Sequence, residues 1–265
     1  MVSSNVSAPS HRKVAIADAF GKAAKKYDKH AEFQREVGER LMEKMPESLQ
    51  GLKVLDIGCG TGYFSNRLAD KGAKVVAADL SAEMLQQARC RCLNKVEQYQ
   101  VADAESLPFS DNQFDVVFSS LALQWCLDLS VPLKELQRVT KPGGKIYFST
   151  LADGSLTELK QAWAKIDAYQ HVNGFLTMKQ INLALAQSGS VSHQLDLRSI
   201  QYWYSSALQL MKDLKGIGAT YVSDRSVGLT KNTALKRVEK EYQAFSNSEK
   251  RLPATYQVCF GTIDL

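Results

Sequence analysis

Strand-like and helix-like segments alternate through the middle of this chain, and their order limits the fold more than any other feature. Five short segments have the length and the β-branched or aromatic content of buried strands: 53–57, 74–80, 97–103, 114–120 and 145–151. Amphipathic segments between most of them predict helical crossovers, which join parallel strands. The sequence therefore predicts an α/β fold with a mostly parallel sheet covered by helices on both faces.

Weaker patterns extend this prediction on either side of the core. Residues 14–45 are predicted to be helical with a break near Asp28, and Phe33, Val37, Leu41 and Met45 form an apolar stripe at every fourth position. Later segments predict helices at 156–169, 178–187 and 206–215, and two more strands at 191–204 and 255–264. We divide the single compact domain into a disordered tail at 1–12, a helical lid at 13–48, a ligand-binding core at 49–152, and a remainder at 153–265 that completes a seven-stranded sheet and carries a helical insertion on the substrate side at about 205–250.

The composition is that of an ordinary globular protein. Apolar residues make up 45% of the 265 residues, and the net charge is only +5. The five cysteines are odd in number and lack metal-ligand spacing, so we expect free thiols in a reducing cytoplasm and no metal site. No signal peptide or apolar run of about 18 residues is present, so no membrane span is expected.

The stretch "VLDIGCGTGYF", residues 54–64, carries the first chemical signal. Its glycines follow the pattern G-x-G-x-G, whereas a dinucleotide fingerprint is G-x-G-x-x-G and would place its third glycine at Tyr63. The phosphate-binding pattern G-x-x-x-x-G-K-[ST] is absent as well. Asp56 precedes the loop, where a carboxylate would repel a pyrophosphate but attract an ammonium or sulfonium group. The loop therefore favours a ligand with a positive end.

Two further acids end the next predicted strands. Asp79 is placed to accept hydrogen bonds from a ribose diol, and Asp103 lies within reach of an adenine amino group. A ligand with a ribose, an adenine and a positive end is S-adenosylmethionine rather than NAD. The alternative is that each aspartate only caps the helix that follows it.

Five segments in order resemble the motifs of class I S-adenosylmethionine-dependent methyltransferases: "VLDIGCGTG", "VVAADLS", "VADAESLPF", "FDVVFSSLALQW" and "LQRVTKPGGKIYFST". The resemblance implies a Rossmann-like fold in which the methionine part of the donor faces Asp56 and the glycine loop. The other residues that it assigns to the donor are Asp79 at the ribose, Leu80 and Met84 beside the adenine, Asp103 and Ala104 at the adenine edge, and Ser119; the glycines are Gly58, Gly60 and Gly62.

The segment after the fourth strand limits the acceptor. Methylases of exocyclic amino groups on nucleic acids carry N-P-P-Y or D-P-P-Y at this point, but this chain reads "SSLALQW". It also lacks the Lys/Arg stripe with interleaved aromatics that follows an RNA strand. A nucleic-acid substrate is therefore disfavoured.

More of the chain is similar to one family. "AIADAFGKAAKKYDKHAEFQ", "LQWC", "GSLTELKQAW", "FLTMKQI", "LKGIGATYV" and "LPATYQVCFG" resemble malonyl-[acyl-carrier protein] O-methyltransferases of the biotin pathway. The resemblance implies methyl transfer to the free carboxylate of a malonyl thioester, giving an ester that primes pimeloyl synthesis. It leaves open whether the carrier is acyl carrier protein or coenzyme A.

Such a reaction needs alignment more than acid–base chemistry. A malonyl carboxylate has a pKa of roughly 3.5 and is ionised at neutral pH, so no general base is expected. We expect Tyr27 and Gln124 to position the acceptor, with Trp125 and Phe175 excluding water; the alternative is that these aromatics are core residues. Arg138 and Lys145 are candidates for the cation that holds the carboxylate, but only through their nearness in sequence.

The stretch "MKDLKGIGATY", residues 211–221, is not a nucleotide loop because no strand precedes it. Lys212 and Lys215 share one helical face, so we expect them to border the acceptor entrance and meet an acidic carrier protein. The alternative is a solvated helix face. Rival functions are methylation of another small acceptor such as a phenol or a different carboxylate, NAD-dependent oxidoreduction, and ligand binding without catalysis.

Overall fold

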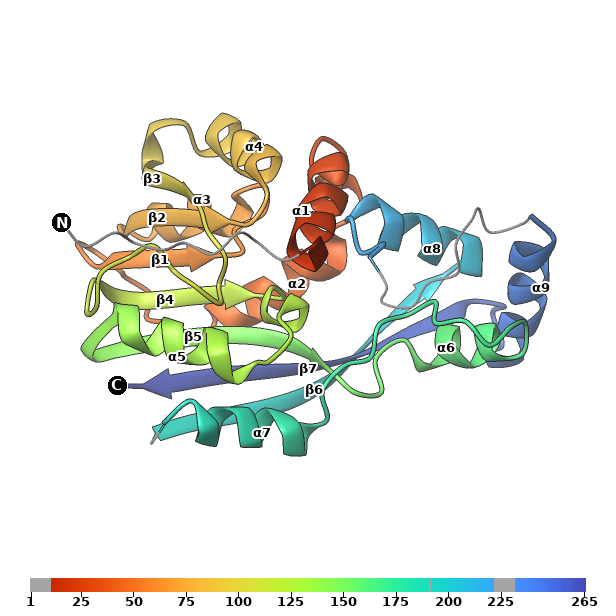
Figure 1. Cartoon of the computed structure of the whole chain (residues 1–265). Coiled ribbons are helices and arrows are strands. Elements are labelled where there is room, and N and C mark those ends of the chain that lie inside the picture. Colours follow the sequence, from red (N-terminus) through yellow and green to blue (C-terminus); the bar gives the residue numbers. More distant parts are fainter. Residues whose placement is uncertain (1–10, 191, 222–231) are drawn as a thin grey trace.

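The computed structural model describes residues 11–190, 192–221 and 232–265 (Figure 1). Its strands are β1 (Lys53–Ile57), β2 (Lys74–Asp79), β3 (Val96–Val101), β4 (Phe114–Ser120), β5 (Thr140–Ala152), β6 (Ser192–Tyr204) and β7 (Leu252–Asp264). Its α-helices are α1 (His11–Ala23), α2 (Glu32–Met42), α3 (Tyr63–Asp70), α4 (Ala82–Cys92), α5 (Ser130–Val139), α6 (Thr157–Ala164), α7 (Met178–Gln187), α8 (Ala207–Gly216) and α9 (Asn232–Tyr242), and two short 3₁₀ helices are η1 (Tyr27–Lys29) and η3 (Leu123–Trp125). The predicted tail lies outside the described residues, except that His11 and Arg12 begin α1.

The strands form one sheet in the order β3-β2-β1-β4-β5-β7-β6. The first five strands of the chain pair in parallel, and β7 runs antiparallel to both β5 and β6. The predicted seven-stranded, mostly parallel sheet is therefore confirmed. Strand order reverses between β1 and β4, and ligands of such sheets bind in the crevice at the carboxyl ends of the strands beside that point.

Helices cover both faces of the sheet because neighbouring residues of each strand alternate between two apolar clusters. Val54 and Phe118 pack with α2, α3 and α4 in one cluster, and Leu55 and Val117 pack with α5 and α7 in the other. This alternation explains why the parallel strands read as continuous apolar runs in the sequence. The buried core on both faces holds the strand ends, and hence the site, in a fixed position.

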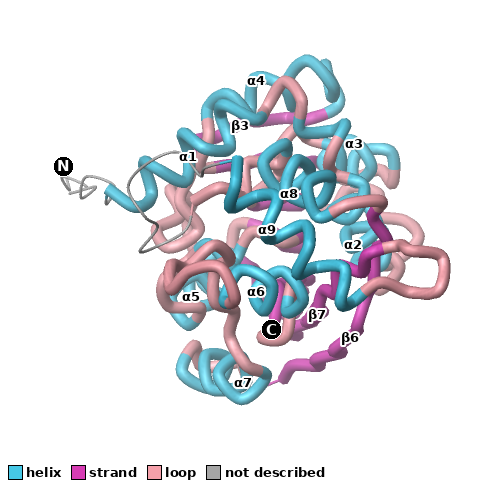
Figure 2. Tube along the Cα trace, turned by 90° about the vertical axis from the view of Figure 1, so that its right-hand side faces the viewer, coloured by secondary structure: helices cyan, strands magenta, loops and turns pink. Residues whose placement is uncertain are grey.

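Beyond the carboxyl ends of the parallel strands the chain adds a cover. Figure 1 shows α1 across that end of the sheet, with α8 beside it and α6 and α9 farther out along the extended β6–β7 ribbon. Figure 2, turned by a quarter, shows α1 next to α4 and α8 in front of the sheet. α1 contacts α4, and α8 contacts β6 and α9. None of the helices in the described ranges is both long and apolar enough to cross a bilayer.

Several predicted boundaries differ from the structure, two of them by about five residues. β5 begins at Thr140 rather than at 145. Its pairing with β4 continues across Pro142–Gly144 with a shift of register, since Phe114 pairs with Thr140 and Val116 pairs with Lys145. α6 ends at Ala164 rather than near 169. The predicted lid consists of α1, η1 and α2, with its break at η1 as expected near Asp28.

Candidate active site

Two adjoining cavities lie at the carboxyl ends of the parallel strands. The first, the glycine-loop cavity, is lined by the loop after β1, the ends of β2 and β4, the segment after β3, and α1. The second, the insertion cavity, lies between α1, η1 and α2 on one side and α8 and the segment after α6 on the other. Both cavities are lined by Phe20, Tyr27, Leu121 and Trp125, so the cavities adjoin at these four side chains, which we call the shared wall.

The glycines of the loop have different roles. Gly58 and Gly60 line the glycine-loop cavity. Gly60 has a φ of +54°, and a Cβ there would meet nothing within 4 Å, so its backbone is open to a ligand. Gly62 does not line the cavity; with a φ of +78°, it would bring a Cβ within 2.9 Å of the Cα of Ala88 on α4. Gly62 therefore permits α3 to pack on α4.

Asp79 lies on the cavity wall and organises the loop. Its Oδ2 accepts a hydrogen bond from the Gly60 N–H at 2.8 Å, and its Oδ1 accepts one from the Ser81 N–H at 2.8 Å. Burial raises the pKa of this carboxyl, and these backbone hydrogen bonds oppose the shift. Each oxygen keeps a further lone pair with which it can accept a hydroxyl from a ligand.

Asp56 is not on the cavity wall. It is buried, and its Oδ2 accepts a hydrogen bond from the Ser65 hydroxyl at 2.6 Å. Burial raises the pKa of Asp56 to about 7, and the nearby charge of Asp79 adds to the rise. Asp56 therefore lies behind the cavity wall, whereas the sequence predicts a place facing the ligand.

The expected adenine residues are brought together. Leu80, Met84, Asp103 and Ala104 all line the glycine-loop cavity. Ser119 does not: it is fully buried, and its neighbour Ser120 lines the cavity instead.

A lysine that the sequence reasoning missed covers the adenine end. Lys13 of α1 donates a hydrogen bond to Asp103 Oδ1 at 2.8 Å and also pairs with Glu105. Its side chain is only 8% exposed. Asp103 Oδ1 accepts a second bond from the Glu105 N–H at 3.0 Å. The ion pairs tie α1 to the segment after β3, and only the fold reveals this contact between residues about ninety positions apart.

Tyr27 and Trp125 lie on the shared wall. Trp125 meets the ring of Phe20 edge to face, with centroids 5.2 Å apart. Burial, with the nearby charge of Asp79, raises the pKa of Tyr27 well above its usual value. The phenol therefore stays neutral and offers a hydrogen-bond donor rather than a base.

η1 is held in place by three polar side chains, which we call the η1 clamp. The Asp28 carboxylate accepts a hydrogen bond from the Thr61 hydroxyl at 2.8 Å and pairs closely with Arg91 of α4. Arg91 also donates to the Thr61 hydroxyl at 2.9 Å. The η1 clamp joins the residue next to Tyr27 to the glycine loop.

Gln124 and Phe175 line the insertion cavity, as expected for acceptor residues. The Gln124 Nε2 donates to the Leu121 carbonyl at 2.7 Å, while its Oε1 is buried and has no partner among the described residues. His171, which no sequence motif singled out, is also on this wall. Its Nε2 lies 2.8 Å from Asp167 Oδ1, and its ring stacks on Trp163 with centroids 3.6 Å apart.

Lys212 and Lys215 are exposed on α8 and line neither cavity. Leu214 and Ile217 of the same segment line the insertion cavity, so the helix presents this apolar face to the cavity and the two lysines to solvent. The glycines of this segment pack against the cover. A Cβ at Gly216 would lie 2.2 Å from the His30 ring, and one at Gly218 would lie 2.9 Å from the Phe20 Cα.

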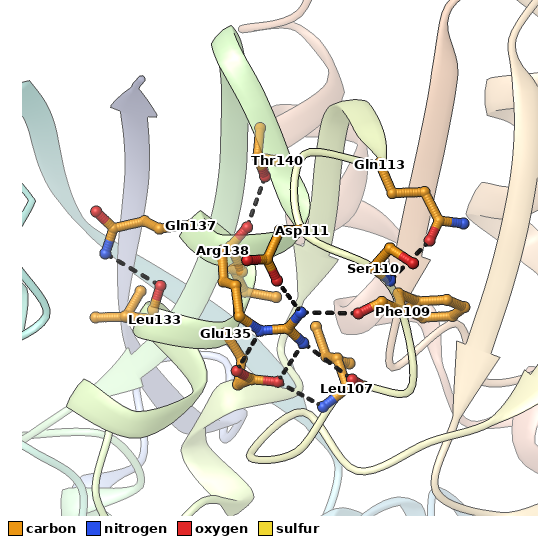
Figure 3. A network of polar contacts seen from close by, with 11 residues as sticks. Leu107, Phe109, Ser110, Asp111, Gln113, Leu133, Glu135, Gln137, Arg138 and Thr140 are labelled. Atoms are coloured by element: carbon orange, nitrogen blue, oxygen red, sulfur yellow. Dashed lines mark hydrogen bonds and ion pairs between the residues drawn. The ribbon is translucent and has the colours of Figure 1, made fainter. Parts of the chain in front are cut away.

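Neither cation suggested by sequence proximity reaches the site. Arg138 binds Glu135, Asp111 and the carbonyls of Leu107 and Phe109, as Figure 3 shows. Lys145 pairs with Asp264 at 2.9 Å. Within the described part of the chain, Arg12 is the one lysine or arginine on the wall of the insertion cavity, and its Nε is buried without a partner.

Comparisons with known proteins agree with this geometry. Residues 55–148 match the family model described as "Methyltransferase domain". Among solved structures, a putative methyltransferase from Bacillus halodurans has a TM-score of 0.60 at 18% identity, covering 85% of this chain and 97% of that one. A phosphoethanolamine N-methyltransferase 2 of Haemonchus contortus, solved with S-adenosyl-L-methionine, has a TM-score of 0.58 at 20% identity, covering 92% of this chain and 57% of that one. These two structures confirm the Rossmann-like methyltransferase fold.

Curated relatives match almost the full length. Malonyl-[acyl-carrier protein] O-methyltransferases of Serratia marcescens and Pectobacterium atrosepticum are 43% and 44% identical, covering 95% and 96% of this chain and 95% and 97% of theirs. The bifunctional biotin biosynthesis protein BioHC of Cellvibrio japonicus is 38% identical over 92% of this chain and 49% of its own length. The chain is an S-adenosylmethionine-dependent methyltransferase and belongs to the malonyl-[acyl-carrier protein] O-methyltransferase family.

Proposed function

We propose that this protein methylates the free carboxylate of malonyl-acyl carrier protein with S-adenosylmethionine, giving the methyl ester that primes pimeloyl synthesis for biotin. The observation that carries the proposal is the shared wall of Phe20, Tyr27, Leu121 and Trp125. A donor in one cavity and an acceptor in the other would meet at that wall. The names of the relatives support malonyl-acyl carrier protein as the acceptor.

The glycine-loop cavity fits S-adenosylmethionine. The open backbone at Gly60 gives room for close approach, Asp79 can accept the ribose hydroxyls, and Leu80 and Met84 offer apolar surface to the adenine. When bound, S-adenosylmethionine supplies a methyl group on a positively charged sulfur. The Asp56 carboxyl, where it is ionised, would favour that positive end from behind the wall, and Asp103 with Ala104 would bound the adenine edge.

The insertion cavity would hold the acceptor. The neutral Tyr27 hydroxyl and the Gln124 amide can orient the malonyl group, and Arg12 on the same wall supplies positive charge. Trp125 and Phe175 exclude water, which strengthens these interactions. Because the carboxylate is already ionised, the residues need only align it, and alignment can lower the barrier by several kcal/mol.

One observation favours a second candidate, a methyltransferase of a phenol. Such an acceptor has a pKa of about 10 and needs a base at neutral pH. The His171–Asp167 pair lies on the acceptor wall and has the arrangement of an oriented general base. A panel of malonyl thioesters and phenols therefore separates the two candidates.

The decisive experiment is incubation of the protein with methyl-labelled S-adenosylmethionine and malonyl-acyl carrier protein. We expect one labelled methyl group on the carrier, located by mass spectrometry on the distal malonyl carboxyl. A labelled phenol, with no label on any malonyl thioester, would instead establish the second candidate.

We further propose that the enzyme works in the cytoplasm, because free thiols suit a reducing compartment.

We also propose that the exposed Lys212 and Lys215 guide an acidic carrier protein to the site. Changing both lysines to Glu should raise KM for malonyl-acyl carrier protein about fivefold, because charges at an interface rim set the rate of encounter. KM for malonyl-coenzyme A should change less. Lys134→Glu, at an exposed position on α5, is the control. Equal KM values in the double variant and the parent enzyme would contradict docking at α8.

A further inference from the structure

A third cavity, which we call the side cavity, joins the insertion cavity from the outside. It lies between η1 and α2 on one side and the end of β6 and α8 on the other, with Lys29, His30 and Asp213 on its wall. Five of its lining residues also line the insertion cavity: Phe33, Gln34, Leu214, Ile217 and Tyr256. Figure 1 shows the corresponding elements, α2 and α8, close together at this end of the molecule. The acceptor space therefore continues toward the surface on the side away from the glycine loop.

Gln34 lies where these two cavities meet. Its Oε1 is buried and has no hydrogen-bond partner in the described part of the chain, and Gln34 is the one residue lining both cavities that has such an atom. A buried carbonyl oxygen without a donor is costly, and few are left so in folded proteins. Its position indicates a ligand that brings an N–H group to the junction.

The wall of the side cavity carries ionisable residues of both signs, with Lys29 and His30 beside Glu32 and Asp213. His30 Nδ1 lies 2.8 Å from Asp213 Oδ1, which ties η1 to α8 across the mouth. Lys29 lines the side cavity, and the exposed Lys212 and Lys215 on α8 are the chain neighbours of the lining residues Asp213 and Leu214; none of these lysines has an ion pair within the described ranges. Glu32 is also on this wall and lowers the net charge. A phosphate at the outer end of a ligand would be attracted to the three lysines.

We propose that the side cavity admits the pantetheine arm of the malonyl thioester and that Gln34 accepts a hydrogen bond from one of its amide N–H groups. The inference rests on the proposed function. The malonyl end must reach the shared wall at Tyr27, so the thioester and its arm must trail away from the glycine loop. The arm carries two amide N–H groups and ends in a phosphate, which matches an unpartnered acceptor at the junction and lysines at the rim.

The test is Gln34→Met, which keeps the side-chain length and removes the amide. For malonyl-acyl carrier protein we expect KM to rise about tenfold, because the variant loses one hydrogen bond to the pantetheine arm. For the S-ethyl thioester of malonate, which has no amide, KM should be unchanged. Gln100→Met on β3, which lines none of the three cavities, is the control and should match the parent enzyme with both substrates.

A binding measurement separates this inference from the proposed function. Calorimetry with S-adenosylhomocysteine present measures the affinity of carrier protein bearing a free pantetheine arm, without turnover. We expect Gln34→Met to weaken that binding about tenfold, whether or not a malonyl group is the acceptor. Unchanged affinity, or an equal rise in KM for the S-ethyl thioester, would overturn the role of Gln34. A parent enzyme that binds the arm but methylates no malonyl thioester would sink the proposed function alone.

Discussion

At the scale of single residues, His171 separates the two candidate chemistries. It lies on the acceptor wall and is held by Asp167, so it can take a proton from a phenol, whereas a malonyl carboxylate has none to give. We predict that His171→Asn leaves kcat for malonyl-acyl carrier protein within about twofold of the parent value, because a general base contributes about 100-fold or more only where a proton moves.

The control for this prediction is His193→Asn on β6, which lines neither the glycine-loop nor the insertion cavity. Steady-state rates and circular dichroism should be measured on both variants. A 100-fold fall in kcat for malonyl-acyl carrier protein at His171 alone, with folding intact, would contradict the prediction and show that His171 takes part in this transfer.

Single residues also show how far the sequence could predict the site. Leu80, Met84 and Asp103 follow strand ends, so a sequence motif is enough to place them near one another, and the structure has them on one cavity wall. The roles of Ser119 and Ser120 are harder to predict, because successive side chains of a strand point to opposite faces of the sheet. A motif does not say which of the two serines faces the cavity.

Lys13, Gln34 and His171 could not be predicted at all. Lys13 meets Asp103 from a helix ninety positions away. Gln34 stands out only through an unpartnered oxygen at the junction of two cavities. Each depends on how distant segments pack, which a single sequence does not reveal.

At the scale of elements, the η1 clamp determines where Tyr27 lies. Arg91 of α4 links Asp28 of η1 with Thr61 of the glycine loop. We predict that Arg91→Ala weakens binding of S-adenosylhomocysteine about fivefold, because η1 then no longer holds Tyr27 over the cavity. The effect is modest because both charged partners are partly exposed.

Calorimetric affinity, compared between Arg91→Ala and Arg89→Ala, tests this. Arg89 is on the same helix, but its guanidinium lies over the Tyr99 ring, away from η1. An equal loss in both variants would show that α4 as a whole, rather than the clamp, supports the site.

Elements with a strong period and clear ends were predictable, and those shaped by packing were less so. β1 and β4 begin and end where their apolar runs do. β5 starts earlier because its pairing with β4 continues through Pro142–Gly144, a segment that looks like a turn when read alone. Gly216 and Gly218 carried no structural prediction from the sequence, but in the structure they let the end of α8 pack closely on His30 and Phe20.

At the scale of the whole molecule, a buried charge near the centre of the sheet connects the site to stability. Asp56 is buried on β1, so folding removes a carboxyl from water. Its pKa rises from 3.8 to about 7. The folded protein therefore holds a proton that the unfolded chain releases at lower pH, and stability is lost as pH rises through about 7.

We predict that the free energy of unfolding of the protein without ligand falls by about 2 to 3 kcal/mol between pH 5 and pH 8 because of Asp56. Asp56→Asn removes the titration and keeps an acceptor for the Ser65 hydroxyl, so its unfolding free energy should change less over the same range. Carboxyls with lowered pKa, such as Asp115 and Glu135, act below this range and leave it unaffected. Urea unfolding of both proteins at pH 5 and pH 8 measures these free energies. Equal changes in the parent protein and in Asp56→Asn would mean that Asp56 is already ionised at pH 5 and that the fold stabilises its charge through another partner.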